Sequence, residues 1–377
     1  ETEKADMNRI QGNAMSTAIS DTSEVLVECR NVWKIFGARA TAAVKAVSER
    51  GLSKRQVLQD FDCVVGVSDA SLKVHRGEIF CIMGLSGSGK STLIRLLNRL
   101  IEPSLGTITV KGRDNAKLNA AELRDMRARN IGMVFQSVAL LPHRTVLENA
   151  AFGLEVRGVP KDERNKTAKA ALDKVGLSDW TSRLPNELSG GMQQRVGLAR
   201  ALAADPEIIL MDEPFSALDP LIRRQLQDEF RQLTKSLGKS AVFITHDLEE
   251  AIRIGDRIAI MKDGVIVQVG TAEDIVTRPA DDYVAEFVAG ISRIHLVKAL
   301  TVMQPVETFA TSHPGIDVSS LMQATPDADI AALIDLTMKS DRDAVAVVED
   351  GRIVGVVTTR DLLCGVAGTP DIHPVAA

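Results

Sequence analysis

The sequence predicts a protein of the α/β class, in which a mostly parallel sheet carries a helical subdomain and a small α+β domain follows. An apolar stretch at 78–83 leads into the segment GLSGSGKS at 84–91 and then into a helix, giving the order strand, loop, helix. A stretch of helical character, with Ala, Leu and charged residues, occupies 137–205. Apolar strand signals then return at 208–212, 241–245 and 257–268. Residues 321–364 show a separate pattern of helix, strand, strand and helix.

The composition is that of a globular, soluble chain long enough for more than one domain. Of its 377 residues, 45% are hydrophobic and 25% charged, and the formal net charge is −5. This acidic balance and an aromatic content of only 3% argue against nucleic-acid binding, so we expect no nucleic-acid partner. No apolar run reaches the ~18 residues that a membrane helix needs. A role at a membrane would therefore require a separate membrane-spanning partner.

The cysteines give no sign of a metal site or a disulfide framework. Cys29, Cys63, Cys81 and Cys364 are scattered, and no C-x-x-C pair occurs. We interpret them as buried thiols of a protein from a reducing compartment.

The N-terminal part begins with polar, unpatterned residues at 1–20, which we expect to form a disordered tail whose native extent is open. Residues 24–36 alternate like a strand. Residues 38–62 then predict a helical insert of two short helices around Gly51, with Ser53 as the N-cap of the second. Its five basic residues outnumber its three acidic ones, so it is either a solvated insert or a surface that contacts anionic lipid.

The segment at 84–91 fits the phosphate-binding pattern G-x-x-x-x-G-K-[ST]. Glycines allow the backbone N–H groups to approach phosphate oxygens, Lys90 can reach the β- and γ-phosphates, and Ser91 offers a hydroxyl to Mg²⁺. We expect the nucleotide to contact the following residues of the loop and the first helical turn: Gly84, Ser86, Gly87, Ser88, Gly89, Lys90, Ser91 and Thr92.

Two carboxylates follow the apolar strand at 208–211. Ligands of open α/β sheets bind at the carboxyl ends of the strands, where Asp212 and Glu213 would lie. Asp212 can hold Mg²⁺ through water, and Glu213 can polarise the attacking water as a general base. The alternative is a solvated strand end without a catalytic role.

The segment LSGGMQQR at 188–195 places small residues at the start of a predicted helix. Ser189, Gly190 and Gly191 would expose backbone N–H groups there, and a helix N-terminus attracts anions. Together with GLSGSGKS, this segment resembles the ATP-binding cassette, the motor subunit of ABC transporters. The fold that this resemblance implies is a RecA-like core with a helical subdomain, spanning 21–290.

The resemblance implies further site residues. Gln136 lies where the cassette has its Q-loop glutamine, which binds the metal and water; otherwise Gln136 is an ordinary loop residue. His246 matches the histidine that contacts the γ-phosphate, and Asp219 lies in the loop that crosses the dimer seam. Phe36 matches the aromatic residue that stacks on adenine, with Trp33 as the second candidate and a core position as the alternative. Ser189 to Gly191 would meet the γ-phosphate held by the opposite subunit, so two complete ATP sites imply a homodimer.

Several longer stretches are similar to one subfamily of cassettes, the ATPases of bacterial importers for glycine betaine, proline betaine, choline and related compatible solutes. They lie at 82–103, 134–153, 216–223 and 246–271. The resemblance implies an ATPase coupled to transmembrane transport at the cytoplasmic face of the bacterial inner membrane. It also implies permease subunits, received at 140–149, and a solute-binding protein that is periplasmic, lipid-anchored or fused to the permease.

The segment at 355–361, GVVTTRD, is similar to the CBS module, in which the Thr and the Asp contact a nucleotide. Here these residues are Thr358 and Asp361. Only one such unit is clear at 321–377, and residues 291–320 are either a linker or a degenerate second unit. We therefore expect either a nucleotide-binding regulatory domain or a dimerising scaffold.

Two other functions are compatible with parts of the pattern. A cassette that acts on DNA or ribosomes would need a long coiled coil or two cassettes in one chain, and neither occurs in this sequence. A nucleotide sensor based on the CBS module would tolerate a damaged catalytic set. All five expected residues are present, however: Lys90, Gln136, Asp212, Glu213 and His246.

Overall fold

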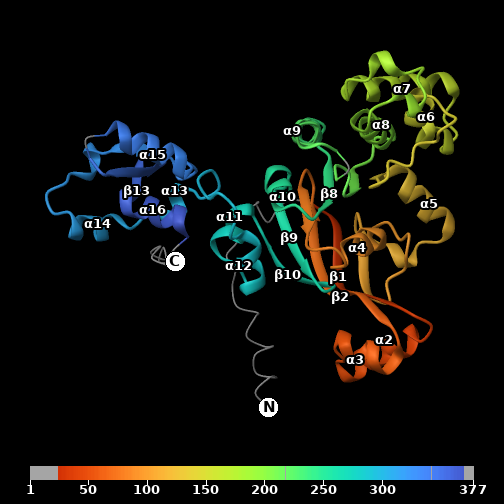
Figure 1. The fold of residues 1–377 in the computed structure, drawn as a ribbon, viewed down its shortest axis with the longest axis horizontal. Coiled ribbons are helices and arrows are strands. Elements are labelled where there is room, and N and C mark those ends of the chain that lie inside the picture. Colours follow the sequence, from red (N-terminus) through yellow and green to blue (C-terminus); the bar gives the residue numbers. More distant parts are fainter. Residues whose placement is uncertain (1–23, 217, 341, 369–377) are drawn as a thin grey trace. The chain divides into compact units, whose positions relative to one another are not determined.

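A computed structural model describes residues 24–216, 218–340 and 342–368 of the chain (Figure 1). The expected tail at 1–20 lies outside the described residues. The described chain divides into two compact units. The first contains residues 24–80, Gly87–Ile244 and Asp263–Val265, and the second contains Cys81–Ser86, Thr245–Lys262 and residues 266–368.

The first unit begins with an antiparallel sheet of order β2-β1-β4-β5. Its strands are β1 (Val25–Phe36), β2 (Val64–His75), β4 (Leu105–Val110) and β5 (Arg113–Asp114). Cys29 pairs with Leu72 of β2 and with Ile108 of β4, so β1 is central. Strand β4 ends at Val110, and Lys111 and Gly112, both with positive φ, form the turn that leads into β5.

The segment between β1 and β2 forms two helices, α2 (Ala40–Arg50) and α3 (Lys54–Phe61), beside that sheet (Figure 1). Gly51 ends α2 in the left-handed conformation, and Ser53 caps α3 with a capping box to Gln56, as the sequence predicted. The helices bury Ala43, Val57 and neighbouring residues against Ile35 and Val65 of the sheet.

The first unit also contains a parallel sheet in the order β3-β8-β7-β6. Its strands are β3 (Ile79–Met83), β6 (Ile131–Val134), β7 (Ile208–Asp212) and β8 (Ser240–Thr245), and β3 is shared with the second unit. Every residue of β3, β7 and β8 is buried, as expected for strands covered on both faces. The accompanying helices are α4 (Lys90–Leu97), α5 (Ala120–Arg129) and α9 (Pro220–Ser236), with the 3₁₀ turn η1 (Asn115–Lys117) before α5.

Between β6 and β7 lies a group of three packed helices, α6 (Val146–Val156), α7 (Lys161–Lys174) and α8 (Gly190–Ala203) (Figure 1). Two 3₁₀ turns, η2 (Ser178–Trp180) and η3 (Pro185–Glu187), connect α7 to α8. This region corresponds to the helical subdomain expected at 137–205. Its first helix begins at Val146, because Thr145 forms a capping box with Glu148.

The second unit contains strands in the order β10-β9-β3, with β9 (Arg257–Lys262) and β10 (Val265–Gly270). Three short helices belong to this part: α10 (Leu248–Ile254), α11 (Ala272–Thr277) and α12 (Asp282–Val288). No helix among the described residues is long and apolar enough to span a bilayer.

The C-terminal module of the second unit is a three-stranded sheet of order β11-β12-β13 covered by helices. Its elements are α13 (Ala299–Val302), α14 (Val306–Ser312), η4 (Val318–Ser320), β11 (Met322–Ala324), α15 (Ile330–Lys339), β12 (Ala344–Glu349), β13 (Arg352–Thr358) and α16 (Thr359–Ala367). Glu349 pairs with Arg352 across a hairpin whose turn is formed by Asp350 and Gly351, both with positive φ. Strand β11, which pairs parallel to β12, was not predicted.

The structure differs from the linker interpretation of residues 291–320. Val297, Ala299 and Val302 are buried in one core cluster of the C-terminal module, and Phe309 is buried in the other. Gln304 also pairs with Val356 of β13 through two backbone hydrogen bonds. This segment packs into the module because its apolar residues complete the module's core, rather than forming a solvated connection to the rest of the chain.

Candidate functional site

The phosphate-loop motif forms a tight turn between β3 and α4. Gly87 and Gly89 have φ of 78° and 103°. Residues with a side chain rarely adopt these left-handed conformations, whereas glycine does so readily. Gly89 is the N-cap of α4 and has no side chain to bond the first N–H groups of the helix. A helix start capped in this way presents backbone donors to an anion. Ser88 lies in the same turn, 4% exposed, and its Oγ has no hydrogen-bond partner among the described residues.

Lys90 is the first residue of α4 and is only 4% exposed. Its Nζ lies 3.9 Å from Oε1 of Glu213. Burial lowers the pKa of Lys90, while the negative charges of Glu213 and Asp212 oppose that effect. The buried cation is therefore held near two carboxylates, at the point where a phosphate would bring further negative charge.

Ser91 and Asp212 are in direct contact. Ser91 Oγ donates a hydrogen bond to Oδ1 of Asp212 at 2.9 Å, and Asp212 is 5% exposed at the end of β7. The other carboxylate oxygen lies 3.9 Å from the guanidinium of Arg95, one helical turn after Ser91. The sequence interpretation did not include Arg95, although its spacing from Ser91 places both residues on one face of α4.

Glu213 has an unusual backbone conformation, with φ of 45° in a residue other than glycine. Its N–H donates to the carbonyl of Ile244 on β8 at 3.1 Å, and its own carbonyl accepts from Ser216 Oγ at 3.0 Å. These bonds hold a conformation that costs of order 1–3 kcal/mol. The strand end therefore fixes the direction in which the Glu213 carboxylate leaves the backbone.

The starts of helices α8 and α9 lie close together and form a second cluster of candidate site residues. Ser189 is the N-cap of α8, and its Oγ accepts from Met192 N at 3.4 Å. Asp219 caps α9 in the same manner, accepting from Ile222 N at 3.1 Å. A Cβ added to Gly191 would lie 3.0 Å from the Ile222 side chain, so the starts of α8 and α9 are neighbours within one chain. Ser189, Gly190 and Asp219 are exposed there.

Comparison of the chain with known proteins shows the family to which it belongs. Two family models match, described as ABC transporter over residues 67–216 and CBS domain over residues 316–368. The chain is 49% identical over 341 residues to the glycine betaine/proline betaine transport system ATP-binding protein ProV of Salmonella typhimurium, covering 90% of this chain and 82% of that protein. The chain belongs to the ABC transporter ATP-binding proteins.

Other relatives carry related names. The glycine betaine transport ATP-binding protein OpuAA of Bacillus subtilis is 50% identical over 288 residues, with 76% of this chain and 69% of that protein covered. The trimethylamine N-oxide transport system ATP-binding protein TmoW of Ruegeria pomeroyi is 44% identical, with 90% and 96% covered. Among solved structures, the dimeric ATP-binding cassette MJ0796 bound to ADP and Pi is 32% identical, with a TM-score of 0.55, 66% of this chain covered and 99% of that chain.

In this cassette Phe36 lies at the surface, with 40% of the residue exposed, which excludes the core position considered as an alternative. A Cβ on Gly66 would lie 2.8 Å from the Phe36 ring and 3.4 Å from the Thr92 methyl group, so the ring is near the first turn of α4. Trp33, the second candidate, packs against the core cluster of the helical insert. The exposed ring therefore favours Phe36 as the aromatic platform.

The two remaining polar residues of the cassette pattern are also exposed. Gln136 follows β6 in the first unit. His246 follows β8 in the second unit, directly before Asp247, the N-cap of α10. Gly84 and Ser86 belong to the second unit as well, whereas the rest of the loop, with Lys90 and Ser91, belongs to the first.

A divalent cation would find only part of its ligand shell in the protein. No group of three or more His, Cys, Asp or Glu side chains that could hold a metal occurs in the part of the chain that the structure describes. The Ser91 hydroxyl and the Asp212 carboxylate are suitable oxygen donors, and Mg²⁺ usually completes its shell with waters and substrate phosphates. The Ser91 and Asp212 oxygens therefore fit a Mg²⁺ ion that is bound together with nucleotide phosphates.

The CBS motif of the C-terminal module has its polar groups bonded within the protein. Thr358 is the N-cap of α16, and its Oγ1 donates to Asp361 Oδ2 at 2.7 Å. Oδ2 of Asp361 also accepts from Thr358 N at 2.8 Å and from Gln304 Nε2 at 3.1 Å. One carboxylate oxygen thus receives three hydrogen bonds that fasten α16 to the segment before α14.

Proposed function

We propose that this chain is the ATP-hydrolysing subunit of an importer for glycine betaine, choline, proline or a related methylated-amine osmolyte. ATP hydrolysis coupled to transport follows from the family to which the chain belongs. The solute class is supported by the names of the relatives. The observation that carries the proposal is the contact group formed by Lys90 with Glu213 and by Ser91 with Asp212. These four residues join the phosphate loop to the end of β7, and this contact supports ATP hydrolysis at that point.

In the proposed mechanism, ATP binds with its phosphates on the loop that precedes α4. Lys90 contacts the β- and γ-phosphates, and the buried Ser88 hydroxyl gains a phosphate oxygen as its partner. Phe36 stacks on adenine. When bound, Mg²⁺ neutralises charge on the phosphates, and Ser91, Gln136 and Asp212 are the residues that would hold it, Asp212 through water. Glu213 accepts a proton from the attacking water, and His246 contacts the γ-phosphate.

We further propose that two copies of the chain share each ATP. One protomer supplies the loop from Gly84 to Thr92, and the other supplies Ser189, Gly190 and Gly191, whose exposed helix start attracts the γ-phosphate. Asp219 lies at the same seam. The exposure of both helix starts supports this arrangement, as does the dimeric state named for the MJ0796 cassette.

The remaining partners follow from the transport role. Membrane-spanning permease subunits would contact the loop at 140–149, and a solute-binding protein would deliver the osmolyte on the other side of the membrane. The chain would then lie at the cytoplasmic face of the inner membrane. Asn149 holds this loop in place, because its buried amide forms hydrogen bonds with the backbone of Leu141, Arg144 and Thr145.

Lipid contact by the insert at 38–62 has less support. Arg39 donates to the Asp60 carbonyl and covers the Phe61 ring, Lys45 faces Glu49, and Lys54 pairs with Asp263. Three of its five basic residues thus have protein partners, which favours a solvated insert. For the C-terminal module, the internal bonds of Asp361 favour a regulatory or dimerising scaffold over a nucleotide site.

The deciding experiment is reconstitution of the chain with its permease and solute-binding protein in vesicles containing ATP. We expect uptake of radiolabelled glycine betaine or another osmolyte of the panel betaine, choline, proline and trimethylamine N-oxide, together with phosphate release. Phosphate release without uptake of any panel member would leave the ATPase intact and refute the solute class. Absence of both with a permease that assembles correctly would refute the proposed function.

A further inference from the structure

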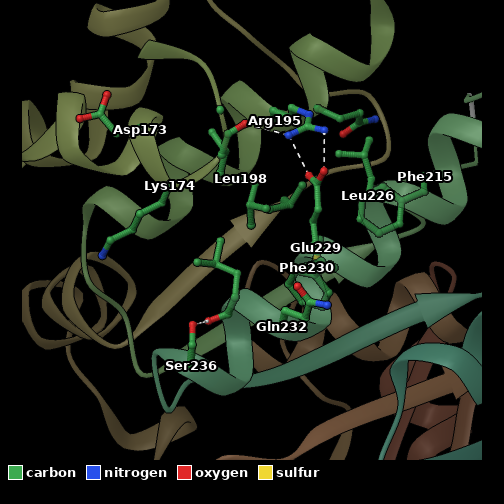
Figure 2. Close-up of a pocket in the computed structure, with 16 residues that line it drawn as sticks. Asp173, Lys174, Arg195, Leu198, Phe215, Leu226, Glu229, Phe230, Gln232 and Ser236 are labelled. Carbon is green, nitrogen blue, oxygen red and sulfur yellow. Dashed lines mark hydrogen bonds and ion pairs between the residues drawn. The ribbon is translucent and has the colours of Figure 1, made fainter.

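The first unit contains a pocket of about 600 Å³. Figure 2 shows the residues that line it. It lies where the end of α7 and the middle of α8 face strands β6 and β7 and the second half of α9. Pockets of several hundred Å³ are the size of small-molecule sites in proteins. None of the residues assigned above to ATP lines it.

Part of the pocket's lining is apolar. Phe215 and Phe230 provide aromatic rings, with ring centroids 6.4 Å apart in an edge-to-face arrangement. The aliphatic and thioether side chains on the walls are those of Val134, Leu198, Met211 and Leu226, each at most 8% exposed in the folded chain. A molecule with a flat apolar body would therefore gain contact area with these walls.

Charged groups also line the pocket, and their charges are balanced. Arg195 Nη1 lies 2.7 Å from Oε2 of Glu229 and also donates to the Val175 carbonyl at 2.9 Å. Figure 2 shows this ion pair joining α8 to α9. Lys174 and Asp173 contribute one charge of each sign. Because the ionic groups compensate each other, the pocket favours an occupant without net charge.

One buried polar group of the pocket is incompletely bonded. Gln194 is 5% exposed and lines the pocket, and its Oε1 has no hydrogen-bond partner among the described residues. A buried acceptor without a donor is destabilising, so a ligand that supplies a donor there is favoured. The terminal amide turns readily about χ3, so its oxygen can face a donor placed in the pocket.

We propose that this pocket binds an uncharged, largely aromatic small molecule with a single N–H or O–H donor, which bonds Gln194 Oε1. The site would also influence ATP turnover. An occupant of the pocket would contact α8, which begins immediately after Ser189. It would also contact β7, which ends at Asp212. This second effect rests on the proposed function, whereas binding itself does not.

The test uses a matched pair of probes, indole and 1-methylindole, with the full chain and no nucleotide. Only indole has an N–H donor. By saturation-transfer NMR and titration, we expect indole to bind about fivefold more tightly, since a satisfied buried acceptor contributes roughly that factor. In Gln194→Leu this preference should disappear, while Gln59→Leu, an exposed glutamine of α3, should keep it. Leu233→Trp, which fills the pocket from a half-buried position, should weaken both probes.

Thermal melting followed by circular dichroism establishes that each variant is folded. Equal binding of both probes to the wild-type chain, or binding of indole that Leu233→Trp does not weaken, would overturn the proposal. So would a pocket occupied by water alone, with neither probe bound. Because these measurements need no ATP, their failure would leave the ATPase role untouched, and a loss of ATPase activity would leave the binding result valid.

Discussion

Ser91 and Asp212, 121 residues apart in the chain, share a hydrogen bond of 2.9 Å between the Ser91 hydroxyl and the Asp212 carboxylate. The first residue lies in the opening turn of α4 and the second at the end of β7. Their contact places the two oxygen groups proposed for Mg²⁺ next to each other at the junction of α4 and β7. The fold itself therefore brings both donors to one point, as a preorganised site requires.

Glu213→Gln should keep ATP binding and stop turnover. The amide is similar in size but cannot accept a proton from water, so we expect phosphate release to fall by about 10²- to 10⁴-fold. Titration with a fluorescent ATP analogue should give an unchanged affinity within about threefold. The control Glu102→Gln changes an exposed carboxylate that pairs with Arg99 and should turn over normally. Phosphate release from the Glu213 variant at the wild-type rate would exclude Glu213 as the base.

Mixed dimers should reveal composite sites. Lys90→Ala and Ser189→Arg should each inactivate a pure dimer, because every site needs one residue from each chain. In a mixed dimer both substitutions fall in the same site, and the other site is intact. We therefore expect partial recovery of phosphate release on mixing. If co-purified mixed dimers, separated by two affinity tags, are as inactive as the pure variants, ATP is not shared in this way.

Asn149→Leu should uncouple transport from ATP hydrolysis. The substitution removes the hydrogen bonds between the Asn149 amide and the backbone of Leu141, Arg144 and Thr145, and so releases the loop proposed to receive the permease. We expect a loss of about 1–3 kcal/mol in stability and near-normal phosphate release by the chain alone. Uptake by the reconstituted complex should fall about tenfold. Asn165→Leu on α7 serves as the control, and equal uptake by both variants would argue against a positioning role for Asn149.

Thr358→Val should destabilise the C-terminal module without a nucleotide effect. The Thr358 hydroxyl caps α16 and bonds Asp361, and loss of such a cap costs about 0.5–2 kcal/mol. The exposed neighbour Thr359, whose hydroxyl makes only a 3.4 Å contact with the Asp343 carbonyl, provides the control Thr359→Val. Differential scanning fluorimetry with AMP, ADP or ATP tests ligand binding in a Lys90→Ala background, in which the cassette site has lost its phosphate-binding lysine. A nucleotide-induced stabilisation that Thr358→Val alone abolishes would establish a nucleotide site in the module.

Maleimide labelling should select Cys364. Cys29, Cys63 and Cys81 are buried, whereas Cys364 is half-buried. Burial raises the pKa of Cys29 to about 12, so its reactive thiolate is rare at neutral pH, on the order of one in 10⁵ molecules. Mass spectrometry should therefore show one rapid modification, and none in Cys364→Ser. Rapid labelling of Cys29 in the native chain would contradict the buried environment, and labelling after denaturation provides the reference for full reactivity.

The sequence was sufficient to predict the phosphate loop and the order of its flanking elements, because local patterns determine them. Lys90 and Ser91 follow glycines at a fixed spacing, and the apolar strand before Asp212 is continuous. The contact between Ser91 and Asp212 could be expected only through the sheet order. Arg95 was missed because a single arginine in a helix has no pattern of its own.

The C-terminal part was harder to predict for a different reason. Strand β11 has only three residues, Met322–Ala324, and two of them are exposed, so it lacks an apolar alternation. The segment at 291–320 has short helices whose buried residues make sense only against strands that come later in the chain. The bond from Gln304 to Asp361 spans 57 positions and likewise depends on tertiary packing.

The hydrogen bonds of Asp361 have an evolutionary consequence. Its carboxylate closes a helix cap and holds Gln304, so replacing it would harm the module whether or not any nucleotide binds there. Selection for a folded module would therefore retain Thr358 and Asp361 independently of any nucleotide. A sequence match to the motif indicates that the helix cap is formed, and a bound nucleotide is a separate property.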